Sequence, residues 1–251
     1  MKAFRLMMAA LLALAMLCGA ACAQEEGHAP KKVVYLTFDD GPKADTPELL
    51  ALLEEEGVPA TFFFVGQKVR TFPEEARMVY ESGHAIGCHT VYHSYSTLKS
   101  GPVYVQKDFN NFITIMREIV SPQFTTDLYR FPGGSTSYKR NIRQTVVDMG
   151  CAWFDWNAMT ADTEAGMTSD DLFHYVVRTA GDEEVVIILA HEGIKRTRWM
   201  LPQMIAYFKD RGYEFRALST GPEDRELLSY CPANMQLPPI EEAGEETEET
   251  P

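Results

Sequence analysis

The stretch YLTFDDGP, residues 35–42, joins a run of hydrophobic residues to two adjacent aspartates and a Gly-Pro pair. Its first four residues have the aromatic, aliphatic and β-branched character of a strand. Asp39 and Asp40 then bring two like charges together at the end of that strand, where they repel each other. One interpretation is that they cap the following turn, because DDGP is also good turn sequence. The other is that the carboxylates have a chemical function, and the rest of the chain favours it.

Short apolar stretches of the same kind recur along the chain and predict a sheet. The predicted strands are residues 33–38, 60–65, 85–88, 128–131, 152–156, 185–190 and 213–217. Amphipathic segments lie between them and predict helices at residues 46–56, 73–82, 103–120, 139–149, 168–179 and 198–211. Several of these helices are followed by a glycine in the C-cap position, namely Gly57, Gly83, Gly150 and Gly212. This alternation indicates a parallel sheet buried on both faces, and seven strands favour a (β/α) barrel over an open sheet.

Residues 1–23 have the pattern of a secretory signal peptide, in which two basic residues precede the apolar run LMMAALLALAML and the small residues of CGAACAQ. We expect cleavage after Ala23. A lipid anchor on Cys22 is the alternative, but Gly19 stands where a lipoprotein signal has leucine. No later run is long enough to cross a membrane. The sequence therefore predicts a secreted or cell-surface protein.

The remainder of the chain divides into three predicted parts. Residues 24–31 form a polar leader, residues 32–218 form one domain, and residues 219–251 form a C-terminal extension. The end of this extension, PPIEEAGEETEETP, contains six glutamates and no basic residue. A segment that is so acidic and so poor in apolar residues is expected to be disordered.

The charge balance limits the partners. The chain has 36 acidic and 23 basic residues, a net charge of −13, and loss of the signal peptide would remove two of the basic ones. This argues against nucleic acid as a partner. An anionic cell-wall polymer would also approach against a repulsive field, unless the binding groove is locally basic.

Three cysteines follow the signal peptide, namely Cys88, Cys151 and Cys231. The count is odd and no CxxC pair occurs, so the sequence does not indicate a disulfide framework. One disulfide bond between two of the three cysteines is the alternative. Cys88 is followed by His89 and is therefore a candidate metal ligand. We favour a small buried residue at the end of a strand instead.

Reactive side chains follow the ends of most predicted strands. In chain order they are Asp39, Asp40, His89, His93, Arg130, Asp155, Asp162 and His191. In a (β/α) barrel the chemistry lies where the strands end and the loops begin. Polar residues without a function would be scattered over both ends of the sheet. Their shared placement therefore predicts an active site at one end.

The segment HTVYH, residues 89–93, indicates a metal site. Two histidines four residues apart share one face of a helical turn, so both rings can reach one ion. This spacing alone is a weak signal, because most such pairs are incidental. A third ligand from one of the two aspartates gives a His₂Asp set with an open position, which is typical of a catalytic zinc. The other aspartate is then free to act as a base on water.

The other groups have structural alternatives. The segment FPGG, residues 131–134, is also a turn sequence, Arg130 can pair with any acidic residue, and His191 can be a buried core histidine. Three further histidines have no partner in the pattern and are assigned to structure or surface, namely His28, His84 and His174. The active site would be absent only if all of these structural alternatives were true at the same time.

Five ordered motifs, TFDDGP, HTVYH, RFPGG, WNAMTAD and LAH, resemble the polysaccharide deacetylases with a NodB-homology domain, carbohydrate esterase family 4. The resemblance covers residues 31–218. It implies an α/β fold, a deformed (β/α) barrel of about seven parallel strands in a single domain. It also implies a divalent metal, with zinc expected first and cobalt or manganese as alternatives, and removal of an acetyl group from an N-acetylated sugar.

The resemblance assigns catalytic roles to residues that match the motifs. Asp39 resembles the catalytic base, Arg130 the residue that orients this base, and His191 the general acid. The metal ligands are expected to be Asp40, His89 and His93.

The resemblance also assigns residues around the acid and the substrate. Asp162 follows Trp156 by six residues and matches the carboxylate that holds the acid histidine better than the competing Asp155. The expected substrate-binding residues are Pro132, Gly133, Trp156 and Leu189. Leu189 belongs to the apolar pocket that receives the acetyl methyl group, and the Gly133 N–H faces the oxyanion.

The chain departs from the family pattern at three positions. Gly133 stands where many relatives have an aromatic residue, so a ring that stacks on sugar is missing there. Thr163 replaces a common tryptophan, and Glu192 stands where aspartate usually follows the acid histidine. These differences concern substrate choice rather than catalysis.

The sequence thus predicts a secreted, metal-dependent hydrolase of amide bonds. Its substrate would be the N-acetyl group of N-acetylglucosamine-type residues in a polysaccharide, either cell-wall peptidoglycan or a chitin-like oligomer. An O-acetyl esterase acting on xylan or another glycan is an alternative, because the chemistry is shared. An inactive carbohydrate-binding protein is the alternative of another class. Such a protein would lack the base or a ligand, and none is missing here.

Overall fold

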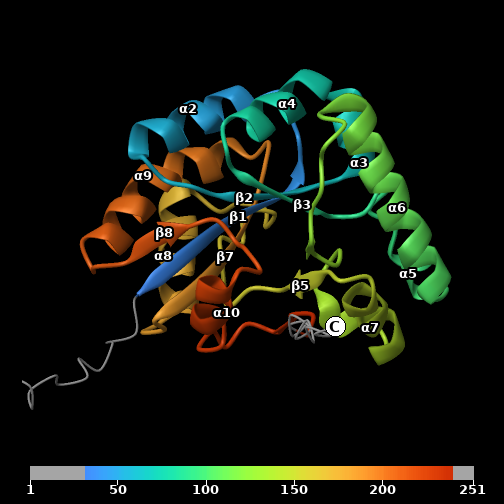
Figure 1. Cartoon of the computed structure of the whole chain (residues 1–251). Helices are drawn as coiled ribbons and strands as arrows, with labels where there is room; N and C mark the ends of the chain where they lie inside the picture. Colours follow the sequence, from blue (N-terminus) through green and yellow to red (C-terminus); the bar gives the residue numbers. More distant parts are fainter. Residues whose placement is uncertain (1–31, 240–251) are drawn as a thin grey trace, which may run out of the picture. The chain divides into compact units, whose positions relative to one another are not determined.

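The computed structural model describes residues 32–239. This range contains a curled sheet of nine strands (Figure 1). Eight of them lie in the order β6-β7-β1-β2-β3-β4-β5-β9, and β8 pairs with the start of β1. The strands are β1 (Val33–Gly41), β2 (Thr61–Phe64), β3 (Ala85–Cys88), β4 (Leu128–Tyr129), β5 (Ala152–Phe154), β6 (Ala158–Met159), β7 (Val185–His191), β8 (Glu214–Arg216) and β9 (Met235–Gln236). All pairings are parallel except that of β9 with β5. The predicted deformed barrel is therefore confirmed.

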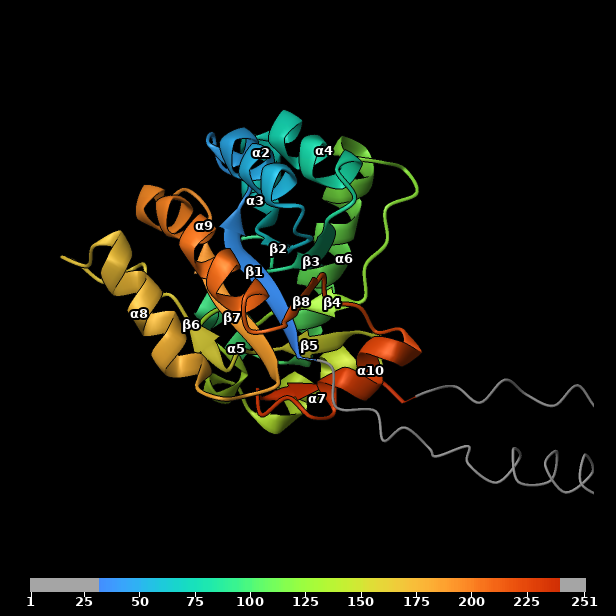
Figure 2. The same ribbon diagram turned by 90° about the vertical axis from the view of Figure 1, so that its left-hand side faces the viewer.

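Most of the helices lie outside this sheet, whereas α10 packs on its inner side (Figure 1). They are α2 (Thr46–Glu56), α3 (Gly66–Thr71), α4 (Pro73–Glu81), α5 (Tyr95–Lys99), α6 (Pro102–Ile119), α7 (Arg140–Asp148), α8 (Ser169–Ala180), α9 (Lys195–Lys209) and α10 (Pro222–Leu228). Figure 2 shows α8 and α9 side by side, next to β6 and β7. Local signals define several of their ends. For example, α2 ends at Gly57 in the left-handed conformation, and α8 begins with a capping box of Thr168 and Asp171.

Side chains from the two faces of the sheet form two separate apolar layers. Along β1, Val34, Leu36 and Phe38 pack between the sheet and the helices. The alternate residues Val33 and Tyr35 point to the inside of the curl and pack with other inward-facing residues. This second layer also contains Leu218, Leu227, Leu228 and Ala233. The part of the chain after residue 218 therefore helps to fill the inside of the sheet.

Several elements differ from the prediction. The predicted strand 152–156 ends at Phe154, and the two-residue strand β6 follows and pairs with β7. The helices α3, α5 and α10 and the strand β9 were not predicted. Within the described residues no pairing joins β6 to β9, so hydrogen bonds do not close the barrel. The missed helices have only five to seven residues and the missed strands β6 and β9 only two, which is too short for a periodic pattern.

The predicted signal peptide, the polar leader and residues 240–251 of the acidic tail lie outside the described residues. None of the helices in residues 32–239 is both long and apolar enough to cross a membrane. The thiols of Cys88, Cys151 and Cys231 are free. Cys88 is fully buried in the layer between sheet and helices, as expected for a small structural residue.

Candidate active site

Asp39 and Asp40 point in different directions because β1 has an irregularity between them. In the pairing with β2, Asp39 and Gly41 take consecutive partners, and Asp40 is the extra residue of a bulge. Asp40 has a φ of 67°, and bulges re-aim side chains in this way next to functional sites. As a result the Asp39 side chain is buried, whereas that of Asp40 is about one third exposed. The bulge therefore separates the two neighbouring carboxylates, one buried and the other partly exposed.

Arg130 follows β4 and holds Asp39 from inside the sheet. It is completely buried, and its Nη1 donates to Asp39 Oδ1 at 2.9 Å and to Thr37 Oγ1 at 2.6 Å. Its other nitrogens donate to the carbonyl oxygens of Phe154 and Asp155, and the guanidinium carbon lies 4.1 Å from the centre of the Phe63 ring. Arg130 is thus fixed by four hydrogen bonds and a ring contact, and it leaves Asp39 Oδ2 free of this ion pair.

Asp40, His89 and His93 form the one candidate metal cluster found within residues 32–239, with their ligand atoms within 4.8 Å of one another. Asp40 Oδ1 lies 3.8 Å from His89 Nε2 and 3.5 Å from His93 Nε2. Asp39 Oδ2 lies 3.6 Å from His89 Nε2, so it faces the same point from the buried side. One carboxylate and two imidazoles in this arrangement fit a divalent transition metal.

The histidines do not share a helical turn, and that part of the prediction was wrong. Residues 89–93 form an irregular loop in which Thr90 and His93 have positive φ values of 70° and 51°. The loop is held from outside, because the buried Asp108 of α6 accepts hydrogen bonds from the Val91 N–H through both carboxylate oxygens. Inside the loop, the Thr90 hydroxyl accepts from the His93 N–H. The contact with Asp108 of α6, rather than the spacing of a helical turn, therefore brings the two histidine rings together.

His89 is prepared as a ligand through its second nitrogen. Its Nδ1 lies 2.9 Å from the carbonyl oxygen of Arg130, so the proton sits on Nδ1 and Nε2 faces the cluster. Burial lowers the pKa of His89 below its ordinary value. The negative charges of Asp39 and Asp40 act in the other direction, but the effect of burial is larger. The ring is therefore neutral at neutral pH, as a metal ligand must be.

His191 ends β7 directly beside Asp39, with which it is paired in register. Its Nδ1 lies 2.7 Å from Asp162 Oδ1, and its backbone N–H donates to Asp162 Oδ2. The Thr197 hydroxyl also donates to Oδ2. Burial alone would lower the pKa of His191, but the hydrogen bond and charge of Asp162, assisted by Asp39, raise it above its ordinary value. The ring is thus held in one orientation and favours the protonated form.

Asp155, the competing carboxylate, has other partners. Its two oxygens accept from the Ser135 N–H and hydroxyl, and Oδ2 also accepts from the Asn234 side chain. Asp155 therefore ties the end of β5 to the loop after Arg130 and to the C-terminal extension. Among the two candidates, only Asp162 contacts His191.

A model of the polysaccharide deacetylase family matches residues 26–153, about half of the chain. The chain belongs to the polysaccharide deacetylase family. A peptidoglycan-N-acetylglucosamine deacetylase of Bacillus cereus is 30% identical to this deacetylase over 199 residues, which are 74% of this chain and 69% of the relative. The named deacetylases among the relatives are hydrolases that act on amide bonds, and the chain is assigned to this class of enzyme.

Solved structures show the same fold as this deacetylase. A CE4 esterase from Streptococcus mutans has a TM-score of 0.70 and 29% identity, covering 75% of this chain and 87% of that one. A polysaccharide deacetylase from Bacillus cereus has a TM-score of 0.68 and 30% identity, covering 75% and 92%.

The predicted substrate-binding residues of the deacetylase lie around the reactive groups. Leu189 lines a cavity of about 210 Å³ together with Asp162, His191 and Met159. Trp156 is half-buried, and its ring centre lies 5.8 Å from the guanidinium carbon of Arg130.

The remaining two predicted residues, Pro132 and Gly133, belong to the loop that follows Arg130. Pro132 is buried, and its carbonyl oxygen accepts from the Tyr138 hydroxyl. Gly133 is exposed and has a φ of 67°, a backbone conformation that favours glycine.

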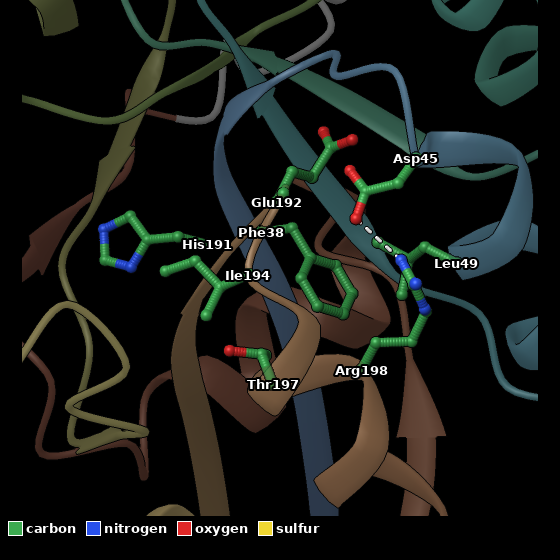
Figure 3. A pocket seen from close by; sticks show the side chains of 9 residues that line it. Phe38, Asp45, Leu49, His191, Glu192, Ile194, Thr197 and Arg198 are labelled. Atoms are coloured by element: carbon green, nitrogen blue, oxygen red, sulfur yellow. Dashed lines mark hydrogen bonds and ion pairs between the residues drawn. The ribbon is translucent and has the colours of Figure 1, made fainter. Parts of the chain in front are cut away.

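Glu192 lies on the opposite side of the β7 end from His191 (Figure 3). It is buried, and its Oε2 accepts from the Thr46 hydroxyl. A Cβ atom at Gly41 would overlap its carboxyl group, so residue 41 must be glycine while Glu192 occupies this place. Burial raises the pKa of Glu192 to about 8. Burial thus favours the neutral form of this carboxyl group.

Some residues of the deacetylase site were not found from the sequence. Thr197 on α9 supports Asp162, and Asp108 on α6 supports the loop of the histidines. Asp108 had a detectable signal, because it is a carboxylate on the apolar face of a helix, among Val105, Phe109 and Phe112. Thr197 had no such signal.

Proposed function

We propose that the chain is a secreted, metal-dependent deacetylase that hydrolyses the N-acetyl group of N-acetylglucosamine residues in a polysaccharide, either cell-wall peptidoglycan or a chitin-like oligomer. The observation that carries the proposal is the meeting of three groups at one end of the sheet. These are the Asp39–Arg130 pair, the cluster of Asp40 with two histidines, and the Asp162–His191 pair. The named activity of the Bacillus cereus relative supports the same substrate. The secretory pattern of residues 1–23 supports export.

The metal would be held by Asp40, His89 and His93, with zinc expected from this donor set and cobalt or manganese as alternatives. A divalent cation there would polarise the acetyl carbonyl group and make water more acidic. The buried His89 fits the role of a metal ligand because its Nδ1 is already engaged by the Arg130 carbonyl oxygen, which leaves Nε2 for the ion.

The chain's own residues supply the two proton transfers of amide hydrolysis. Asp39 takes a proton from the attacking water at Oδ2, because Oδ1 is engaged by Arg130. His191 enters the reaction protonated and gives the proton at Nε2 to the leaving amine nitrogen, because its Nδ1 is engaged by Asp162. The carbon–nitrogen bond breaks with this transfer, and acetate and a free amino sugar result.

The proposal is tested by acetate release from three substrates in parallel: N-acetylchitooligosaccharides, peptidoglycan and acetylated xylan, each with purified protein and added metal. We expect release from at least one of the two N-acetylated substrates and little from the xylan. Preferential release from acetylxylan would instead identify an O-acetyl esterase. No release from any of them would indicate a protein that has lost activity.

A pH prediction follows from the Asp162–His191 pair. The raised pKa of His191 means that its acid form is present below that value and disappears as the pH rises through it. Asp162→Asn removes the charge that raises this pKa. The alkaline limb of the pH–rate profile should therefore move to lower pH, while the metal content stays unchanged.

Asp155→Asn is the matched control for this experiment, because it makes the same change in a carboxylate that contacts Ser135 instead of His191. Its alkaline limb should stay in place, although its thermal stability should fall. If the alkaline limb moves only in Asp155→Asn, His191 held by Asp162 is not the general acid. The same conclusion follows if the limb moves in neither variant.

A further inference from the structure

Tyr95 places an aromatic ring at the edge of the candidate metal cluster. It is the first residue of α5, two positions after His93, and the centres of the two rings are 5.4 Å apart with their planes at 84°. The side chain is not part of the core, since Tyr95 is 41% exposed. An aromatic ring with this much free surface beside reactive groups is available to a ligand.

The edge of the same ring borders Gly133. A Cβ atom built on Gly133 would come within 2.8 Å of Tyr95 Cε1 and 2.9 Å of its hydroxyl oxygen, so the ring fills the space of a side chain at that position. The ring therefore lies between His93, from the loop after β3, and Gly133, from the loop after β4. An aromatic ring is thus present at the place where the sequence at position 133 lacks one.

Further contacts limit the movement of the Tyr95 ring. The Ser94 side chain caps α5 by accepting from the Thr97 N–H. The Lys99 ammonium lies 5.9 Å from the centre of the Tyr95 ring and 5.3 Å from that of the buried Tyr138, within the range of cation–π contacts. A ring that is already held loses little conformational freedom when it binds a ligand.

We propose that Tyr95 is a substrate-contacting residue that binds a pyranose ring of the polysaccharide by stacking. The inference rests on the proposed function, because that function makes the ligand a sugar chain. The faces of a pyranose ring that carry C–H groups are apolar and pack against aromatic rings. The geometry that supports this role is the position of the ring between His93 and Gly133, in a residue that is 41% exposed. Lys99 also supplies a positive charge at this edge of the site in a strongly acidic chain.

The test measures binding of N-acetylchitopentaose by calorimetry to the metal-loaded Asp39→Asn protein, in which turnover is suppressed. Adding Tyr95→Ala should weaken the affinity about tenfold, in line with the loss of one aromatic contact. Tyr95→Phe keeps the ring and should bind within about twofold of the parent. Tyr104→Ala is the matched control, because Tyr104 on α6 is similarly exposed, at 44%, and belongs to neither loop. The metal content of every variant is measured in parallel and should be equal.

A second arm tests the contact with Gly133. Gly133→Ala should weaken binding when Tyr95 is present, because the added methyl group displaces the ring. In the Tyr95→Ala protein the ring is gone, so the loss caused by Gly133→Ala should be smaller there and limited to the backbone strain of alanine at a φ of 67°. Such non-additivity is expected only if the two positions act through the ring.

The outcomes separate this inference from the proposed function. Equal affinity of Tyr95→Ala and the parent, or a loss in Tyr104→Ala of the same size, would overturn the role of Tyr95 alone. Affinity as weak in Tyr95→Phe as in Tyr95→Ala would also overturn it, because the ring would not be the contact. If the parent binds no glycan at all, the proposed function fails, and the role of Tyr95 fails with it.

Discussion

Asp39→Asn is expected to lower the rate of acetate release about a hundredfold or more while the protein keeps its metal ion. The asparagine oxygen can still accept the hydrogen bond from Arg130 that Asp39 Oδ1 accepts now. What the amide cannot do is take a proton from water at the position of Oδ2. The measurement is kcat on an N-acetylchitooligosaccharide, together with metal analysis of the same preparation.

The neighbouring substitution Asp40→Asn is the control, because it makes the same chemical change one residue away. It should lower the metal content, since Asp40 belongs to the cluster and Asp39 is engaged by Arg130. The thermal stability of both proteins should be followed, because Asp39→Asn leaves the buried charge of Arg130 without its partner. Loss of metal in Asp39→Asn, with metal retained in Asp40→Asn, would mean that the two aspartates have been assigned in the wrong order.

His93→Ala is expected to remove close to one metal ion per chain and to abolish measurable acetate release. Only Asp40 and His89 of the cluster would remain, and two protein ligands do not hold a catalytic ion tightly. The fold should survive, because the His93 side chain is about one third exposed and its loss opens no cavity in the core. Metal analysis after dialysis, with thermal denaturation of the same protein, gives both results.

His174→Ala is the matched control for this variant. His174 lies on α8 with a side chain that is two-thirds exposed, and its partner is Asp170. This variant should keep its metal and its activity. Equal metal content in His93→Ala and the unmodified protein would show that the ion, if present, binds elsewhere.

The placement of the reactive residues was predictable because it depends on local features. An apolar run marks each strand, and the polar residue that follows lies at the carboxyl end of a parallel sheet. The sequence pattern alone places Asp39, His89 and His191 at one end of the sheet, and the motif spacing selects Asp162 over Asp155.

The conformation of the metal loop was not predictable in the same way. The positive φ values of Thr90 and His93 are stabilised by Asp108, which is 17 residues away from Val91 along the chain. The position of Tyr95 beside Gly133 likewise joins two loops that the sequence separates by 38 positions. Such contacts depend on how the helices pack against the sheet, and a short sequence window does not contain them.

The inner layer of the sheet has a consequence for the synthesis of this protein. Tyr35 on β1 donates to Asp224 at 2.8 Å across a separation of 189 residues, and Leu227 and Leu228 pack in the same layer. One face of β1 therefore stays without its final cover until residues 224–228 have been synthesised. Contacts between such distant residues form slowly, and an apolar strand that waits for its cover is prone to aggregate. During synthesis, the strand that carries Asp39 is therefore exposed to aggregation for the longest time.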